Sequence, residues 1–181
     1  MEDSSDRSLV LRTKRGELDA YGALVQRYQG SIFNVCYRML GNTHDAEDLA
    51  QETFIRAHSR LDSYDCDRPF IPWARRIAVN LCLNYINRNR RYALPLDDEF
   101  ESSVSRERIP ERALEVRERN ASLREALRML PAHYRAVIEL RHFQDQSYLQ
   151  ISEALNIPLS DVKSHLFRAR KSLARRMGKD V

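Results

Sequence analysis

The stretch QSYLQISEALNIPLSDVKSHLFRARKSLARRM, residues 146–177, decides the fold of this chain. Its first part predicts a helix over 148–155, with Ser147 as the N-cap and an apolar face formed by Ile151, Ala154 and Leu155. Asn156 and Pro158 end this helix, because Asn tolerates left-handed geometry and Pro disfavours a helical conformation at the residue before it. A second helix follows. Two short helices around a tight turn have the outline of a helix-turn-helix.

The second helix is expected to begin after Ser160, a good N-cap, and it has two distinct faces. Its packing face holds apolar side chains at spacings of three and four: Val162, Leu166, Ala169 and Leu173. Its other face is polar and basic: Lys163, Ser164, Phe167, Arg168 and Lys171. Such a helix fits a major groove, where Arg and Lys bind phosphates and the first turns meet base edges. A solvated basic helix on any all-α protein shows the same pattern, so the rest of the chain must decide.

Composition indicates an all-α protein of one large or two small domains. The 181 residues include only five Gly and six Pro, and most of the chain has a 3.6-residue apolar period. The net charge of +4 is mild, but its distribution is uneven, with basic residues concentrated in 68–91 and 162–179 and acidic residues in 44–52 and 97–101. Two basic patches suggest two contacts with a polyanion. The acidic patches suggest a basic protein partner or an autoinhibitory segment.

The cysteines and the hydropathy pattern narrow the class of protein further. Cys36, Cys66 and Cys82 are odd in number and form no CxxC, so neither a disulfide framework nor a zinc site is indicated. No apolar run approaches the roughly 20 residues that span a bilayer. We therefore expect no direct membrane insertion and a cytoplasmic location.

The first sixty residues predict core helices. A short helix is expected over 7–15, and a second is expected to be capped by Asp19 and to face inward from Tyr21 to Tyr28. Gly30-Ser31 is expected to open a third helix that ends at Gly41. Thr43 then caps a long helix to about Arg60, whose polar side carries Asp45, Glu47, Asp48, Gln51, Glu52 and Arg56. A solvated face is the plain interpretation, because acids in a first turn suit the helix dipole. The alternative is a metal site formed by His44, Glu47, Asp48 and Glu52, which is disfavoured because no second helix offers matching ligands. We expect no metal and no cofactor.

A polar loop and a second basic helix come next. The loop over 61–70 carries an aromatic residue, Tyr64, which is expected at its tip. The helix over 72–91 is expected to bury one apolar face, formed by Ala74, Ile77, Ala78, Leu81 and Tyr85. The opposite stripe and the start of the helix offer Trp73, Arg76, Asn80, Asn84, Arg88 and Arg91. Asn and Arg hydrogen-bond bases, and aromatic rings stack on unpaired ones. The pattern thus favours single-stranded or distorted nucleic acid as a partner.

Periodicity is lost after this helix. Residues 92–112 are rich in Asp, Glu and Ser, which predicts a linker between two domains. The second domain is expected to open with a helix over 110–130 that Pro131 ends.

The order of these parts resembles the extracytoplasmic-function (ECF) group of the sigma-70 family, the initiation factors of bacterial RNA polymerase. The resemblance covers nearly all of residues 7–176 and rests on three stretches in order: CYRMLGNTHDAEDLAQETFIRA from Cys36, WARRIAVN from Trp73, and IPLSDVKSHLFRAR from Ile157. It implies two small helical domains, over 1–92 and 116–181, joined by an acidic flexible linker over 93–115. Within this group, the chain is similar to the stress-responsive type that an anti-sigma factor restrains.

The resemblance also implies roles for the residues. Asp48, Gln51 and Glu52 are expected to dock on the β′ clamp helices of core polymerase. Tyr64 is expected to capture a flipped base of the minus-10 element, with Trp73, Arg76, Asn80, Asn84, Arg88 and Arg91 along the same strand. The second domain is expected to contact the β-flap and to bind the duplex minus-35 element through Ser160, Asp161, Lys163, Ser164, His165, Phe167, Arg168 and Lys171. Ser160-Asp161 and His165 depart from the pattern of many relatives, which have Gly-Thr and Arg there, and this bears on minus-35 preference.

Three other classes of protein explain the sequence less completely. An ordinary two-domain transcriptional regulator explains the helix-turn-helix but not the loop with Tyr64 or the Asn and Arg stripe. An enzyme needs a convergent nucleophile, base or metal set, and the sequence has no Walker loop, no GxSxG and no paired His at ligand spacing. A helical adaptor leaves both basic stripes unexplained. The sequence therefore predicts a promoter-recognising subunit with no catalytic residues.

Overall fold

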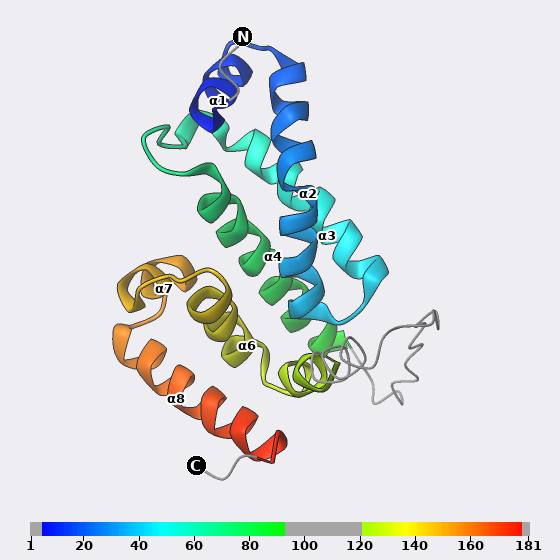
Figure 1. The fold of residues 1–181 in the computed structure, drawn as a ribbon, viewed down its shortest axis with the longest axis vertical. Helices are drawn as coiled ribbons and strands as arrows, with labels where there is room; N and C mark the ends of the chain where they lie inside the picture. Colours follow the sequence, from blue (N-terminus) through cyan, green and yellow to red (C-terminus); the bar gives the residue numbers. More distant parts are fainter. Residues whose placement is uncertain (1–4, 93–120, 179–181) are drawn as a thin grey trace, which may run out of the picture.

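The computed structural model describes residues 5–92 and 121–178, and these ranges form an all-α fold. The expected linker over 93–115 lies outside the described residues. Figure 1 shows two helical groups, an amino-terminal group above and a carboxyl-terminal group below. Among the described helices, none combines the length and apolar character that crossing a bilayer requires.

The amino-terminal group contains α1 (Asp6–Lys14), α2 (Leu18–Leu40), α3 (Thr43–Ser59), the short 3-10 helix η1 (Leu61–Ser63) and α4 (Phe70–Tyr92). Asn42, and not Thr43, caps α3, because its side-chain oxygen accepts a hydrogen bond from the Asp45 amide at 3.0 Å. The helix break expected at Gly30-Ser31 is wrong, since α2 runs through both residues. Gly lowers helix propensity by about 1 kcal/mol, and the apolar face of α2 packed on α3 and α4 outweighs that cost.

The core of this group is filled by fully buried side chains, the largest of which is Phe70 at the first turn of α4. Leu24, Ile32 and Met39 from α2 lie in the same core. The predicted apolar face of α4 is confirmed for Ala74, Ile77, Ala78 and Leu81, whereas Tyr85 is only half-buried. This packing fixes which side of α4 faces outward.

The carboxyl-terminal group contains a helix over 121–128, α6 (Ala132–Ile138), a π-helical turn η2 (Glu139–Phe143), α7 (Tyr148–Leu155) and α8 (Leu159–Arg176). The predicted helix-turn-helix is confirmed as α7 and α8. Ser147 and Gln150 form a reciprocal capping box, and Asn156 ends α7 in the left-handed conformation with φ of 51°. Ser160 does not cap α8, which begins one residue before it and has Pro158 at the N-cap position.

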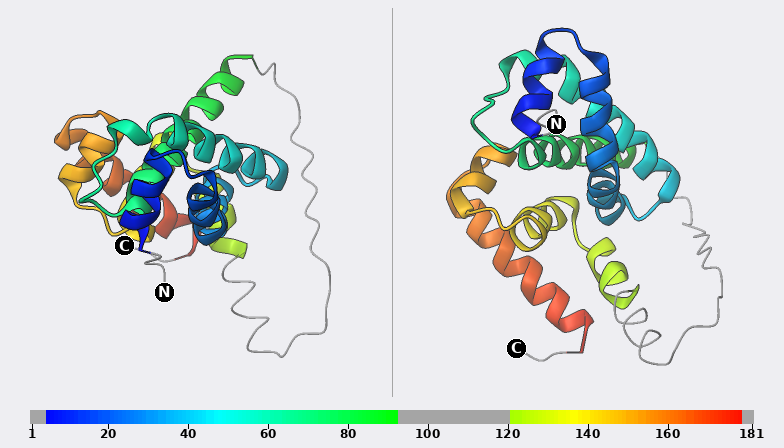
Figure 2. Two further views of the ribbon diagram at one scale, coloured as in Figure 1. Left: turned by 90° about the horizontal axis from the view of Figure 1, so that it is seen from above. Right: turned by 45° about the horizontal axis from the view of Figure 1, so that its top comes forward.

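The two groups pack against each other along α4, which Figure 2 shows lying between α1–α3 and the α6–α8 group. Their buried residues form one apolar cluster. A bidentate ion pair joins the two groups. The guanidinium of Arg38 in α2 donates to both carboxylate oxygens of Glu139 in η2 at 2.7 Å. Arg135 of α6 also donates to the carbonyl of Met39. The helix-turn-helix is therefore held beside α4 in this structure.

Candidate nucleic-acid interface

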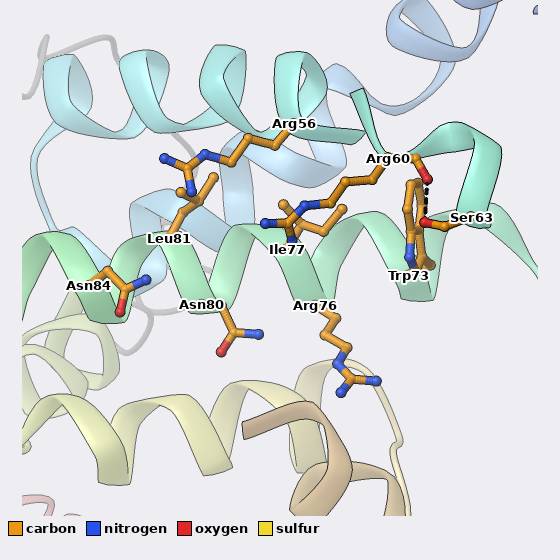
Figure 3. Close-up of a pocket in the computed structure, with 9 residues that line it drawn as sticks. All are labelled: Arg56, Arg60, Ser63, Trp73, Arg76, Ile77, Asn80, Leu81 and Asn84. Carbon is orange, nitrogen blue, oxygen red and sulfur yellow. Dashed lines mark hydrogen bonds between the residues drawn. The ribbon is translucent and has the colours of Figure 1, made fainter. Parts of the chain in front are cut away.

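A cavity of about 410 Å³ opens between α3 and α4, and Figure 3 shows the side chains around it. Its lining combines one aromatic ring, three guanidinium groups and two amides over an apolar floor: Arg56, Arg60, Ser63, Trp73, Arg76, Ile77, Asn80, Leu81 and Asn84. The floor is apolar, because Ile77 and Leu81 pack with Ala57 of α3 and are at most 8% exposed. Polar groups at the rim and apolar ones below are typical of ligand-binding pockets.

The helical repeat of α4 places the sequence-predicted residues on one side. Trp73, Ile77 and Leu81 follow the edge that faces α3, while Arg76, Asn80 and Asn84 follow the adjacent edge. Figure 3 shows Arg76 and Asn80 pointing away from α3 toward the carboxyl-terminal group. Asn84 and Arg88 are exposed, Asn80 is half-buried, and the side chain of Arg91 lies outside the described residues. The structure therefore brings four of the predicted strand-contacting residues to one cavity.

Tyr64 does not lie where the sequence suggested. The residue is only 6% exposed, its ring lies 4.6 Å from the ring of Trp73 between centroids, and its hydroxyl donates to the Arg68 carbonyl. Burial raises the pKa of its phenol to about 12. Phe70 and Trp73 cover the ring because the loop folds back on the start of α4. Tyr64 thus supports Trp73 from behind, and the expectation of an exposed ring at the loop tip is corrected.

Arg56 and Arg60 are functional candidates that the sequence did not reveal. They are four residues apart, Arg56 on the last turn of α3 and Arg60 at its C-cap, and both line the cavity. Arg56 also donates to Glu52 at 2.6 Å, which orients its guanidinium along α3. Their spacing alone suggests only a shared helix face, and the crossing of α3 over α4 is what directs that face toward Trp73.

The outward face of α8 remains accessible although the groups are packed together. Ser160, Lys163, Phe167, Arg168 and Lys171 are exposed, Phe167 by 67%. Asp161 and Ser164 are half-buried and bonded to each other, since the Ser164 hydroxyl donates to the Asp161 carbonyl. His165 faces inward, with its ring 4.8 Å from His133 and 5.3 Å from Tyr134 of α6 between centroids. His165 therefore packs between helices, and its predicted place on the DNA face is corrected.

A second hollow, of about 540 Å³, lies between α2 and α3 and has mainly apolar walls. Gln51 lines it together with Val25, Phe33 and Ile55, and Ile55 is 64% exposed. Asp48 and Glu52 do not line this groove. They follow the next stripe of α3, where Asp48 pairs with His44 at 3.2 Å and Glu52 pairs with Arg56. Within the described ranges no cluster of His, Cys, Asp and Glu is arranged to hold a metal ion.

Comparison with known proteins agrees with this arrangement. The model of sigma-70 region 2 matches residues 24–92, and the model of sigma-70 region 4 matches residues 120–173. The ECF RNA polymerase sigma factor SigW of Bacillus subtilis is 37% identical, with 93% of this chain and 94% of the relative covered. The RNA polymerase sigma-H factor of Pseudomonas aeruginosa is 33% identical, with 96% and 94% covered.

Two solved structures share the fold. CnrH in complex with the cytosolic domain of CnrY matches with a TM-score of 0.66 and 24% identity, over 99% of this chain and all of that one. The sigma factor RpoE in complex with the anti-sigma factor NepR from Bartonella quintana matches with a TM-score of 0.68 and 22% identity, over 89% and 98%.

A helix-turn-helix with an exposed basic face is typical of a DNA-binding protein, and the helical group beside it carries an aromatic and basic cavity. The chain belongs to the sigma-70 family, and within it to the ECF sigma factors. It is accordingly a subunit that core RNA polymerase uses to initiate transcription at promoters, and it is not an enzyme.

Proposed function

We propose that residues 1–92 bind core polymerase and the melted minus-10 strand, that residues 93–115 link the domains, and that residues 116–181 bind the duplex minus-35 element. The cavity between α3 and α4 is the observation that carries this proposal. It offers a flat indole, Trp73, beside the amides of Asn80 and Asn84, with the guanidinium groups of Arg56 and Arg60 along its rim. Bases stack on aromatic rings for about 1–3 kcal/mol each, and the phosphates between them need cations.

An unpaired strand suits this cavity better than a duplex does. A base turned out of the helix exposes one flat face and its Watson–Crick edge, and local unstacking costs a few kcal/mol. Trp73 receives the face, and the amides reach the edge. Tyr64 and Phe70 hold the indole in place from the core side. We therefore assign Tyr64 a supporting part and Trp73 the stacking part.

The groove between α2 and α3 is the proposed contact for the β′ clamp helices of core polymerase. A surface that exposes Ile55 by 64% beside Phe33 and Val25 gains from apolar burial, and Gln51 adds a hydrogen-bonding group to it. Asp48 and Glu52 lie on the neighbouring stripe of α3, outside the groove, where they pair with His44 and Arg56, and Glu47 is the carboxylate that lines the groove itself. All of the residues that line the groove belong to α2 and α3, and none belongs to the helix-turn-helix.

The basic face of α8 is the proposed contact with the minus-35 duplex. Lys163, Arg168 and Lys171 offer cations to phosphates, and Ser160 with Asp161 lies in the first turn, where base edges are met. The expected contact of this domain on polymerase is the β-flap. The expected inhibitory partner is an anti-sigma factor. The expected location of the chain and these partners is the cytoplasm.

Permanganate probing of promoter DNA bound by core polymerase and this chain tests the proposal. Trp73→Ala should leave the closed complex intact and strongly reduce the reactivity of melted thymines. Trp73→Phe keeps an aromatic face and should retain most of it. Wild-type reactivity with Trp73→Ala would overturn the strand-binding part of the proposal. An ordinary regulator would instead bind duplex DNA tightly without polymerase.

A further inference from the structure

One side chain of α1 connects this helix to the loop beside the cavity between α3 and α4. Lys14 lies in the last turn of α1, and its ammonium donates to the carbonyl of Asp62 at 3.3 Å and to the carbonyl of Tyr64 at 3.0 Å. The two acceptors are 48 and 50 positions away in the sequence. The contact therefore joins two parts of the chain that no local pattern links.

These two carbonyls lie at the end of a short helical turn that shapes the cavity. Arg60 lies at the start of η1 and Tyr64 at its end, and Arg60 and Ser63 both line the cavity. Figure 3 shows the Ser63 hydroxyl bonded to the Arg60 carbonyl beside Trp73. Carbonyls at the end of a helix lack partners within it and carry the negative end of its dipole, so an ammonium suits them. Lys14 thus fixes the side of the cavity that carries Arg60 and Ser63.

The same ammonium also fixes the residue that supports Trp73. It bonds the main chain of Tyr64, while the hydroxyl at the far end of the Tyr64 side chain donates to the Arg68 carbonyl. Between these two points the Tyr64 ring lies against the rings of Trp73 and Phe70. Tyr64 is therefore held at both ends, and the indole of Trp73 has a fixed wall behind it.

Helix α1 offers Lys14 a firm base. Leu9 and Val10 of α1 are at most 3% exposed. A second contact between α1 and the loop, the ion pair of Arg7 with Asp67 at 2.9 Å, has side chains that are 65% and 76% exposed. Exposed pairs contribute little to stability, whereas Lys14 is half-buried and bonds main-chain atoms. Of these two contacts, the one made by Lys14 is expected to constrain the loop.

We propose that Lys14 is a positioning residue for base capture, which holds η1 and the Tyr64–Trp73 ring pair in place before a melted strand arrives. This rests on the proposed function of the cavity and deepens it. A loop that is ordered in advance loses less conformational freedom when a strand binds, so more of the stacking energy is available for melting. Lys14 is not among the residues that line the cavity, and it acts through the loop. Its effect falls on melting and not on the duplex contact of α8.

Tryptophan fluorescence of the full chain tests the positioning without DNA, because Trp73 is the single tryptophan of the sequence. Lys14→Met keeps the aliphatic stem and removes the donors, whereas Lys14→Arg keeps donors and charge. Arg7→Gln is the matched control, since it removes a cation of the same helix that contacts the same loop through the exposed pair. Lys14→Met should make the indole more accessible to acrylamide and lower its fluorescence anisotropy, with an unchanged helical circular dichroism signal. Lys14→Arg and Arg7→Gln should match wild type.

Permanganate probing of the holoenzyme then tests the consequence for melting, at a temperature at which wild-type complexes are partly melted. Lys14→Met should lower the reactivity of melted thymines about tenfold, in line with the loss of a hydrogen bond to a charged group. Capture of core polymerase and formation of the closed complex should stay at the wild-type level, and Lys14→Arg should restore most of the melting. If Lys14→Met does not fold, Lys14→Gln takes its place; it keeps one neutral donor and should show both losses in smaller measure.

A folded Lys14 variant with wild-type quenching and anisotropy would overturn the inference, and so would a looser indole combined with wild-type melting. Equal losses in Arg7→Gln would also overturn it, because they would trace the effect to the charge of α1 and not to the two carbonyl contacts. Trp73→Ala separates this inference from the proposed function. If Trp73→Ala melts DNA as wild type does, the proposed function fails. If Trp73→Ala blocks melting and Lys14→Met does not, only the positioning by Lys14 is refuted.

Discussion

Arg56 and Arg60 provide the most quantitative test of the strand-binding cavity. Each guanidinium at the rim that neutralises one phosphate of a single strand adds about 0.7 to the slope of log affinity against log salt. Arg60→Ala should therefore lower the slope by about 0.7. Arg56 already pairs with Glu52 at 2.6 Å, so its contribution lies between zero and the same value. The double variant should lower the slope by about 0.7 to 1.4.

Because the slopes differ, the affinities of wild type and the double variant should approach each other as salt is added. If the slopes differ by 1.4, the ratio of wild-type affinity to double-variant affinity should fall about sevenfold as the salt concentration rises from 0.1 to 0.4 M. The assay is fluorescence anisotropy of holoenzyme on forked DNA, with a single-stranded non-template segment taken from a promoter that it transcribes. Arg27→Ala is the matched control, since it removes the same charge from a guanidinium that pairs with Asp6 and does not line the cavity. A double variant with the wild-type slope would refute the placement of the strand along α3.

Three further outcomes are expected. Ile55→Ala should weaken capture of core polymerase, because it removes exposed apolar surface from the α2–α3 groove. The helical circular dichroism signal should stay unchanged, and undiminished capture would count against that groove. Arg168→Ala and Lys171→Ala should each reduce the salt slope of holoenzyme binding to the duplex minus-35 element by about 0.9, as measured by anisotropy, whereas an equal slope removes that residue from the interface. Burial raises the pKa of Tyr21 and Tyr64 to about 12, so their stabilising effect should be complete below about pH 10 and lost as pH rises through 12. Denaturant unfolding of a Tyr21→Phe and Tyr64→Phe double variant should show a weaker alkaline loss, and an identical loss contradicts the assignment.

The helix-turn-helix could be predicted from sequence because its signals are local. Ser147 and Gln150 are three residues apart and form the capping box, and Asn156 adopts the left-handed conformation at the end of the same helix. The spacing of apolar residues gave both packing faces. The polar stripe of α4 could be predicted for the same reason, because Arg76, Asn80 and Asn84 lie on one helix and their spacing places them on one side of it.

Features that depend on distant contacts could not be predicted. Arg56 and Arg60 look solvated until α4 crosses beneath α3. Tyr64 is covered by the rings of Phe70 and Trp73, which a polar loop sequence does not indicate. The ion pair between Arg38 and Glu139 spans 101 positions of sequence, and no local pattern links the two residues. Gly30 also misled the prediction, because tertiary packing of α2 outweighs its low helix propensity.

Transcription in vitro with purified core polymerase and a library of promoter fragments tests the central claim most directly. The account predicts that the chain joins core polymerase and moves initiation to a defined set of start sites, each preceded by a melted element and an upstream duplex element at fixed spacing. RNA synthesis that begins at the same sites with and without the chain would contradict it.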